Sequence, residues 1–106
     1  MIKEKIAIIG TGNYGIAIGK RLLEYDFEIV YGSRNPDIDY LKDCFQNSRN
    51  KSSYSVTNIV DAWHKSDQIV FFAVSAFDTV YENIVNDVVK SINKTNNRAK
   101  IVIDIS

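Results

Sequence analysis

A glycine motif near the start of the chain restricts its fold more than any other feature of the sequence. The motif follows the apolar run Ile6–Ile9 directly and leads into residues with a helical pattern. It consists of Gly10, Thr11, Gly12, Asn13, Tyr14 and Gly15. This is the pattern G-x-G-x-x-G, which between a strand and a helix is typical of the first βαβ unit of a dinucleotide-binding domain.

Each glycine of the motif has a separate physical purpose in such a unit. Gly10 permits the tight turn out of the strand, Gly12 leaves no side chain between the backbone and a diphosphate, and Gly15 lets the helix pack closely on the strand. The free N–H groups at the start of the helix, together with its dipole, attract negative charge. We therefore expect residues 10–15 to bind the diphosphate of a dinucleotide.

Strands and helices alternate along the remainder of the chain. Apolar runs predict five strands, at residues 5–10, 27–31, 54–56, 68–74 and 100–105. Helical patterns predict a helix after each of the first four strands, at residues 13–25, 36–46, 59–63 and 76–92. The predicted fold class is therefore α/β, a doubly wound parallel sheet of the Rossmann type. A complete Rossmann sheet has six strands, so residues 1–106 are expected to form one domain that is truncated at its C-terminus.

Two of the predicted helices begin with recognisable cap residues. Asn35 fits the N-cap of the second helix, and Pro36 fits its first position, where a missing N–H does no harm. Ser75 followed by Asp78 fits a capping box at the start of the fourth helix.

The end of the second predicted strand indicates which dinucleotide the chain binds. Domains that bind NAD place an acidic residue there to hold the ribose 2′-hydroxyl. Here the residues are Gly32, Ser33 and Arg34. Arg34 can pair with a 2′-phosphate and stack on adenine, and the Ser33 hydroxyl can donate a hydrogen bond to the phosphate. We therefore expect NADP(H) rather than NAD(H).

The loop after the fourth predicted strand is expected near the nicotinamide end of the cofactor. The carboxyl ends of parallel strands meet at one edge of the sheet, where ligands of this fold class bind. The loop residues are Ala73, Val74 and Ser75. Ser75 is also explained by helix capping alone.

Composition excludes several classes of function. Basic and acidic residues number 13 each, so the net charge is zero and no basic field attracts nucleic acid. The single cysteine, Cys44, and the single histidine, His64, have no ligand-spaced partners, so no metal site is expected. No apolar run approaches the ~20 residues of a membrane helix, and the charged N-terminus is no signal peptide. These features predict a cytoplasmic protein and leave its oligomeric state open.

Several of these segments resemble a known group of reductases in the same order along the chain. They are the run Ile8–Gly15, the Gly-Ser-Arg-Asn-Pro segment at residues 32–36, the pair Asp61-Ala62, and residues 69–74 and 103–106. The chain resembles the cytosolic reductase domain of the STEAP metalloreductases and the related deazaflavin-dependent NADP reductases. The segment 32–36 favours the STEAP proteins, whereas Asn13 is the residue that the deazaflavin enzymes carry.

The resemblance implies that NADPH donates hydride to a flavin, FAD in the STEAP proteins. Haem and the reduction of ferric or cupric ions would belong to a C-terminal membrane domain absent from this chain, which would place the chain on the cytosolic face of a membrane, endosomal ones included. It implies that residues 11–14 hold the diphosphate, that Ser33 and Arg34 hold the 2′-phosphate, and that residues 73–75 approach the nicotinamide ribose. It identifies no catalytic acid or base.

Two alternatives remain open from the sequence. The pattern Gly-x-Gly-Asn-x-Gly followed by Ala17 and Ile18 also resembles imino- or keto-acid reductases such as the pyrroline-carboxylate reductases. A non-catalytic module that binds NADPH and senses redox state is the third interpretation.

Overall fold

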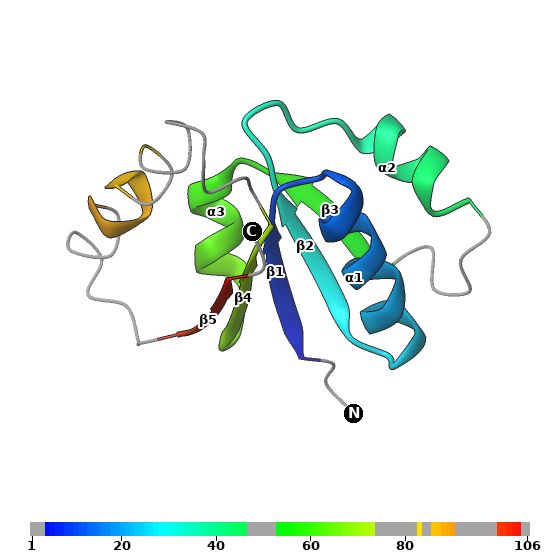
Figure 1. Ribbon diagram of the computed structural model, residues 1–106, viewed down its shortest axis with the longest axis horizontal. Helices are drawn as coiled ribbons and strands as arrows, with labels where there is room; N and C mark the ends of the chain where they lie inside the picture. The colour runs from blue at the N-terminus through cyan, green and yellow to red at the C-terminus, as the bar shows by residue number, and fades with distance from the viewer. Residues whose placement is uncertain (1–3, 47–52, 74–82, 84–85, 91–99, 105–106) are drawn as a thin grey trace.

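The computed structural model describes residues 4–46, 53–73, 83, 86–90 and 100–104 of the chain. Five parallel strands form one sheet in the order β3-β2-β1-β4-β5 (Figure 1). The strands are β1 (Lys5–Ile9), β2 (Glu28–Gly32), β3 (Tyr54–Thr57), β4 (Ile69–Phe72) and β5 (Ile101–Asp104). This order is that of the first five Rossmann strands, so the predicted fold class is confirmed.

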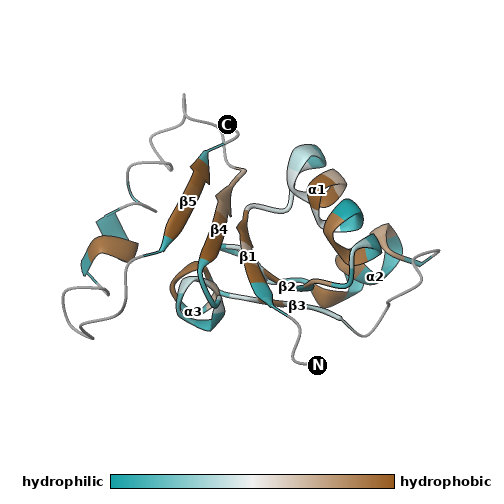
Figure 2. Cartoon of the chain, turned by 90° about the horizontal axis from the view of Figure 1, so that it is seen from below, coloured by the Kyte–Doolittle hydropathy of each residue, from teal (hydrophilic) through white to brown (hydrophobic). Residues whose placement is uncertain are grey.

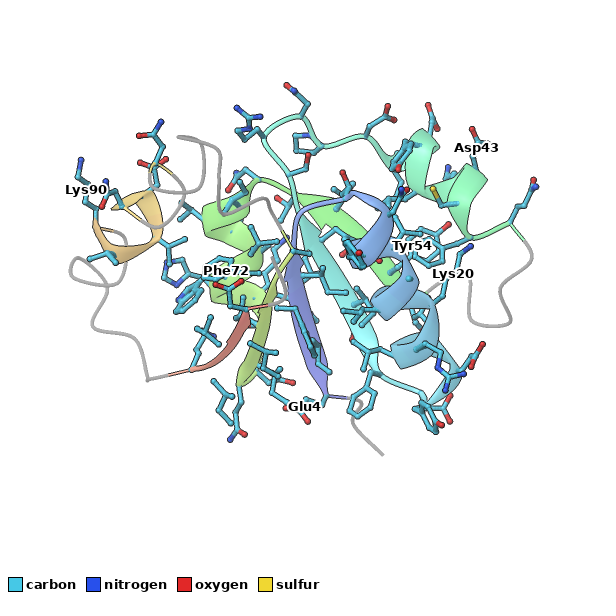
Figure 3. All side chains as sticks on the ribbon, viewed as in Figure 1. Glu4, Lys20, Asp43, Tyr54, Phe72 and Lys90 are labelled. Atoms are coloured by element: carbon cyan, nitrogen blue, oxygen red, sulfur yellow. The ribbon has the colours of Figure 1, made fainter. Side chains whose placement is uncertain are left out.

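The helices lie on both faces of the sheet, as Figure 2 shows. They are α1 (Asn13–Glu24), α2 (Ile38–Cys44) and α3 (Ile59–Lys65), and residues 86–90 are also helical. Lys20, Asp43 and Lys90 point outward from the helices (Figure 3). The charged residues are therefore on the solvent side of the helices.

The central strand β1 shows why its apolar run has no polar interruption. Successive side chains of a strand point to opposite faces, and here both faces are covered. Ile6 and Ile8 join the core beneath α1 and α2, whereas Ala7 and Ile9 join the core beneath α3. All four are buried, so this strand must be apolar throughout.

The outer strand β5 differs from the other strands in burial. Its Ile101, Val102 and Ile103 are exposed, although they pair with β4 in regular register. In the helix above, Val88 is buried but Val89 is exposed. The continuous apolar pattern therefore overstates burial at this side of the sheet.

Helix α1 packs closely on β2 through two of its glycines. A Cβ atom added to Gly19 would collide with the Tyr31 hydroxyl, and that hydroxyl donates a hydrogen bond of 2.8 Å to the Gly15 carbonyl. Ala17, between these glycines, is exposed. The buried residues of α1 follow i, i+4 spacing from Gly15 and turn Ala17 to solvent.

The predicted start of α2 is also wrong. The N-cap is Asp37, not Asn35, and its carboxylate accepts a hydrogen bond of 3.1 Å from the Tyr40 N–H. The Asn35 N–H donates instead to the Ser33 hydroxyl at 3.2 Å. This side-chain turn keeps Asn35 and Pro36 in the loop after β2, so the helix begins two residues later than expected. The proposed capping box at residues 75–78 lies outside the described residues.

Candidate functional site

Three loops meet at the carboxyl edge of the sheet because their first residues extend the strand ladders. The Gly10 N–H donates to the Gly32 carbonyl at 2.9 Å, and the Ala73 N–H donates to the Ile9 carbonyl at 2.9 Å. The Ser33 N–H donates to the last carbonyl of β3 at 3.0 Å. The chain order reverses between β1 and β4, and this reversal point is where ligands bind in open α/β sheets.

The glycines of residues 10–15 fall into two kinds. Gly10 has φ 112°, a conformation that side chains with a Cβ rarely adopt. A Cβ added to Gly15 would lie 2.5 Å from the Gly10 carbonyl oxygen, whereas a Cβ added to Gly12 meets no atom within 4 Å. The fold itself therefore requires glycine at positions 10 and 15, but the space beside Gly12 is open to a ligand.

The N-terminus of α1 is suited to an anion. Gly12 is its N-cap and supplies no side-chain cap, and no acidic residue occupies the first turn. Asn13 and Tyr14 are exposed. The first N–H groups of a helix lack intrahelical partners and carry partial positive charge. The structure thus leaves these donors available on the side where the sheet edge opens.

Thr11 contributes to this loop through its backbone. Its carbonyl oxygen accepts a hydrogen bond of 3.0 Å from the Tyr40 hydroxyl of α2. Thr11 is half-buried and Tyr40 is 42% exposed. The glycine loop is therefore connected to α2 as well as to the strands.

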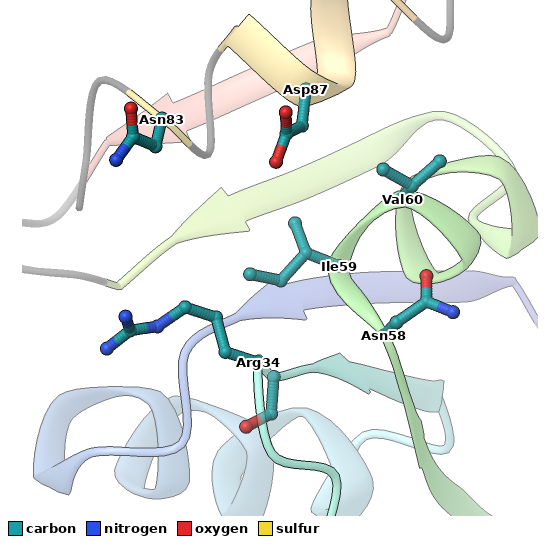
Figure 4. Close-up of a pocket in the computed structure, with 7 residues that line it drawn as sticks. Arg34, Asn58, Ile59, Val60, Asn83 and Asp87 are labelled. Carbon is teal, nitrogen blue, oxygen red and sulfur yellow. The ribbon is translucent and has the colours of Figure 1, made fainter.

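Ser33 and Arg34 line a cavity of about 350 Å³ beside the end of β2. The other lining residues are Asn58, Ile59, Val60, Asn83 and Asp87. Asn83 and Asp87 lie on one side of the cavity and Arg34 on the other, with Ile59 between them (Figure 4). The volume falls within the range of small-ligand sites.

The Arg34 side chain is free to bind an anion. It is exposed, and the ion pairs found among the described residues join Lys5 to Glu28 and Arg21 to Glu24. Within this part of the chain no carboxylate neutralises Arg34. Because Ser33 and Arg34 stand where NAD-binding domains carry an acid, the end of β2 carries a cation that no carboxylate of the described residues pairs with.

The structure brings most of the predicted site residues to one edge and adds others. Residues 10–15, Ser33, Arg34 and Ala73 lie there, whereas Val74 and Ser75 lie outside the described residues. Asn58 was not predicted as a site residue, although it directly follows β3 and caps α3. Tyr40 and the cavity residues on the helix after β4 were not predicted either, since their positions depend on packing.

A sequence model of the family described as "NADP oxidoreductase coenzyme F420-dependent" matches residues 5–106. The chain belongs to this family. The predicted enzyme class, an NADP-dependent oxidoreductase, agrees with the description of this family.

Solved structures show the same fold in longer proteins. The PH0520 protein of Pyrococcus horikoshii OT3 has a TM-score of 0.68 at 23% identity and matches 96% of this chain and 26% of its own. A putative F420-dependent NADP-reductase of an Arthrobacter species has a TM-score of 0.65 at 20% identity, over 96% and 44%. A lactate dehydrogenase from a deep-sea metagenome has a TM-score of 0.64 at 17% identity, over 99% and 38%.

These comparisons support one of the two family resemblances expected from the sequence. The chain spans less than half the length of these structural neighbours. The relation to the deazaflavin-type NADP reductases is confirmed by the family, since coenzyme F420 is a deazaflavin, and the assignment to STEAP proteins is not. Among the described residues, no helix has the length and apolar character to cross a bilayer, and no group of candidate metal ligands occurs.

Proposed function

We propose that this NADP oxidoreductase domain binds NADPH along the carboxyl edge of its sheet and presents the nicotinamide to a deazaflavin. The diphosphate would lie against residues 10–15, and the 2′-phosphate against Ser33 and Arg34. The observation that carries the proposal is the pairing of two features the fold does not need. These are the open space beside Gly12 and the uncompensated cation Arg34 at the rim of a cavity.

The cavity beside Arg34 has the chemistry of an adenosine site. Ile59 and Val60 offer an apolar wall, and the planar Arg34 guanidinium can cover the opposite face of an adenine ring. Asp87 lies across the cavity from Arg34 (Figure 4). There its carboxylate can accept a hydrogen bond from the exocyclic amine of adenine while staying apart from the 2′-phosphate.

The nicotinamide end would pass the junction of β1 and β4. Ala73 lies close to the start of α1, since its Cβ would be 3.4 Å from a Cβ added to Gly15. Its small side chain leaves room above this junction, and we extend the contact to Val74 and Ser75. When bound, NADPH supplies a hydride that a deazaflavin accepts, and the protein positions the two rings.

The family and Asn13 favour a deazaflavin over FAD as the acceptor. FAD is the alternative from the resemblance of residues 32–36 to the STEAP proteins. Haem and a membrane domain would matter only in that alternative.

The phosphate assignment is tested by Arg34→Asp, with Lys20→Asp as the matched control. Both variants change the net charge equally, but Lys20 points to solvent from α1 (Figure 3). NADPH fluorescence titrations should show Kd rising about 10- to 100-fold for Arg34→Asp, since charge-assisted hydrogen bonds contribute roughly 1.5–3 kcal/mol each. NADH binding should weaken much less, because NADH has no 2′-phosphate and loses only the stacking of Arg34 on adenine. Equal NADPH affinity in the wild type and Arg34→Asp would refute the 2′-phosphate site.

The acceptor is tested by stopped-flow absorbance of the nicotinamide band. NADPH should be oxidised when coenzyme F420 is added to the chain, and Gly12→Ala should reduce the rate at subsaturating NADPH. Oxidation with FAD alone would favour the STEAP-like alternative, and oxidation with an imino acid would favour the pyrroline-carboxylate type. Tight NADPH binding without turnover by any acceptor would indicate a binding module.

A further inference from the structure

Helix α2 contacts the glycine loop, residues 10–15, through the side chain of Tyr40. The Tyr40 hydroxyl donates a 3.0 Å hydrogen bond to the Thr11 carbonyl, across 29 positions of sequence. Tyr40 is the third residue of α2, whose first turn is fixed by the Asp37 cap on the Tyr40 N–H. The hydroxyl is therefore presented from an anchored backbone.

This hydrogen bond has a consequence for the neighbouring amide. The Thr11 carbonyl and the Gly12 N–H belong to one planar trans peptide, so they point in opposite directions. Because the carbonyl points to Tyr40, the Gly12 N–H points away from α2. Beyond the adjoining residues, no atom of the described chain lies within 4 Å of a Cβ added to Gly12. Gly12, the N-cap of α1, also makes no side-chain cap hydrogen bond that would fix this peptide.

We propose that Tyr40 is a positioning residue for the cofactor, which holds the Thr11–Gly12 peptide with its N–H turned toward the diphosphate of NADPH. The inference rests on the proposed function, because it assigns a further residue to the same site. Tyr40 does not touch the cofactor in this arrangement. It lowers the cost of ordering the loop, so that binding does not have to select one peptide orientation among several.

The surroundings of Tyr40 keep its hydroxyl a donor. The neighbouring Cys44 side chain raises the pKa of Tyr40 above the usual tyrosine value of about 10. The phenol thus retains its proton at neutral pH and remains able to donate to the Thr11 carbonyl.

Two ligands separate this positioning role from a general structural role. NADPH contains both the diphosphate and the 2′-phosphate, whereas adenosine 2′-monophosphate contains only the 2′-phosphate. Tyr40→Phe removes the donor and keeps the ring, and Tyr25→Phe, at the exposed C-cap of α1, is the matched control. We expect Tyr40→Phe to raise the Kd for NADPH about fivefold and to leave the Kd for adenosine 2′-monophosphate unchanged.

The outcomes distinguish the two proposals. Equal loss of affinity for both ligands in Tyr40→Phe, or no loss for either, would overturn the positioning role while wild-type binding still supports the proposed function. A wild-type chain that binds neither ligand would refute the proposed function and this inference together. The urea midpoint of each variant shows that the compared proteins are folded.

Discussion

Alanine substitution at two glycines of the same motif should give opposite phenotypes. Gly12→Ala places a methyl group in open space, where no atom lies within 4 Å. Gly15→Ala places it 2.5 Å from the Gly10 carbonyl oxygen, a backbone atom that cannot rotate away. The first change should impair binding without harming the fold, and the second should harm the fold.

The magnitudes follow from the local geometry. At Gly12, φ is −75°, which alanine can adopt without strain. Alanine restricts the unfolded chain and so stabilises the fold by ~0.4–1 kcal/mol. This gain offsets the loss of stability that comes from alanine being a weaker N-cap than glycine. The free energy of unfolding should therefore change by less than about 1 kcal/mol. At Gly15, overpacking costs about 1–3 kcal/mol, and better helix propensity returns at most ~1 kcal/mol.

The assay pairs urea unfolding with NADPH titration for both variants. Gly12→Ala should raise the Kd for NADPH about 10-fold or more, because the methyl group holds the diphosphate away from charge-assisted donors. Gly15→Ala should lower the urea midpoint. The reasoning would be refuted by a Gly12→Ala protein that binds NADPH as tightly as the wild type, or by one as unstable as Gly15→Ala.

Three further predictions concern the contacts that hold α1 and α2 on β2. Tyr31→Phe should lower the free energy of unfolding by roughly 1–2 kcal/mol in urea titrations, because it removes the buried hydrogen bond to the Gly15 carbonyl. Burial raises the pKa of Tyr31, so its contribution is complete below the unfolded value of about pH 10 and is lost as pH rises above it. Between pH 8 and pH 11 the urea midpoint should therefore fall further for the wild type than for Tyr31→Phe. Equal decreases in the two proteins would contradict this prediction. Asp37→Ala should remove the side-chain cap of α2 and lower the free energy of unfolding by about 1 kcal/mol. It should also raise the Kd for NADPH, and by a smaller factor when Tyr40→Phe is already present. Additive effects of the two changes in this double-mutant cycle would contradict coupling through Tyr40.

The fold was predictable because the spacing of apolar residues along each segment is typical of either a strand or a helix. The apolar run of β1 requires cover on both faces, and α1 and α3 provide it. The start of α2 after Asp37 was not predictable, since Asn35 and Asp37 are both good caps and the hydrogen bond of Asn35 to the Ser33 hydroxyl decides between them. Such a choice depends on a contact two residues away and not on propensity.

Only the site residues that follow the end of a strand were predictable from the sequence. Arg34 could be assigned because the last residue of β2 fixes its place at the sheet edge. Asn83 and Asp87 could not, because their entry into the cavity depends on how their helix packs over α3. Tyr40 reaches Thr11 from a different helix, and no spacing rule connects the two positions.

The packing of this domain separates the residues that build it from those that a ligand must explain. Gly10, Gly15 and Gly19 each meet a backbone or side-chain constraint, so a protein with this fold needs them even without a cofactor. Gly12 and Arg34 meet no such constraint among the described residues, yet they occupy the loops after the adjacent strands β1 and β2 at the carboxyl edge of the sheet. A glycine with empty space around it and a cation without a carboxylate are each weak evidence alone. Together they match the diphosphate and the 2′-phosphate of one NADP molecule, as the proposed function requires.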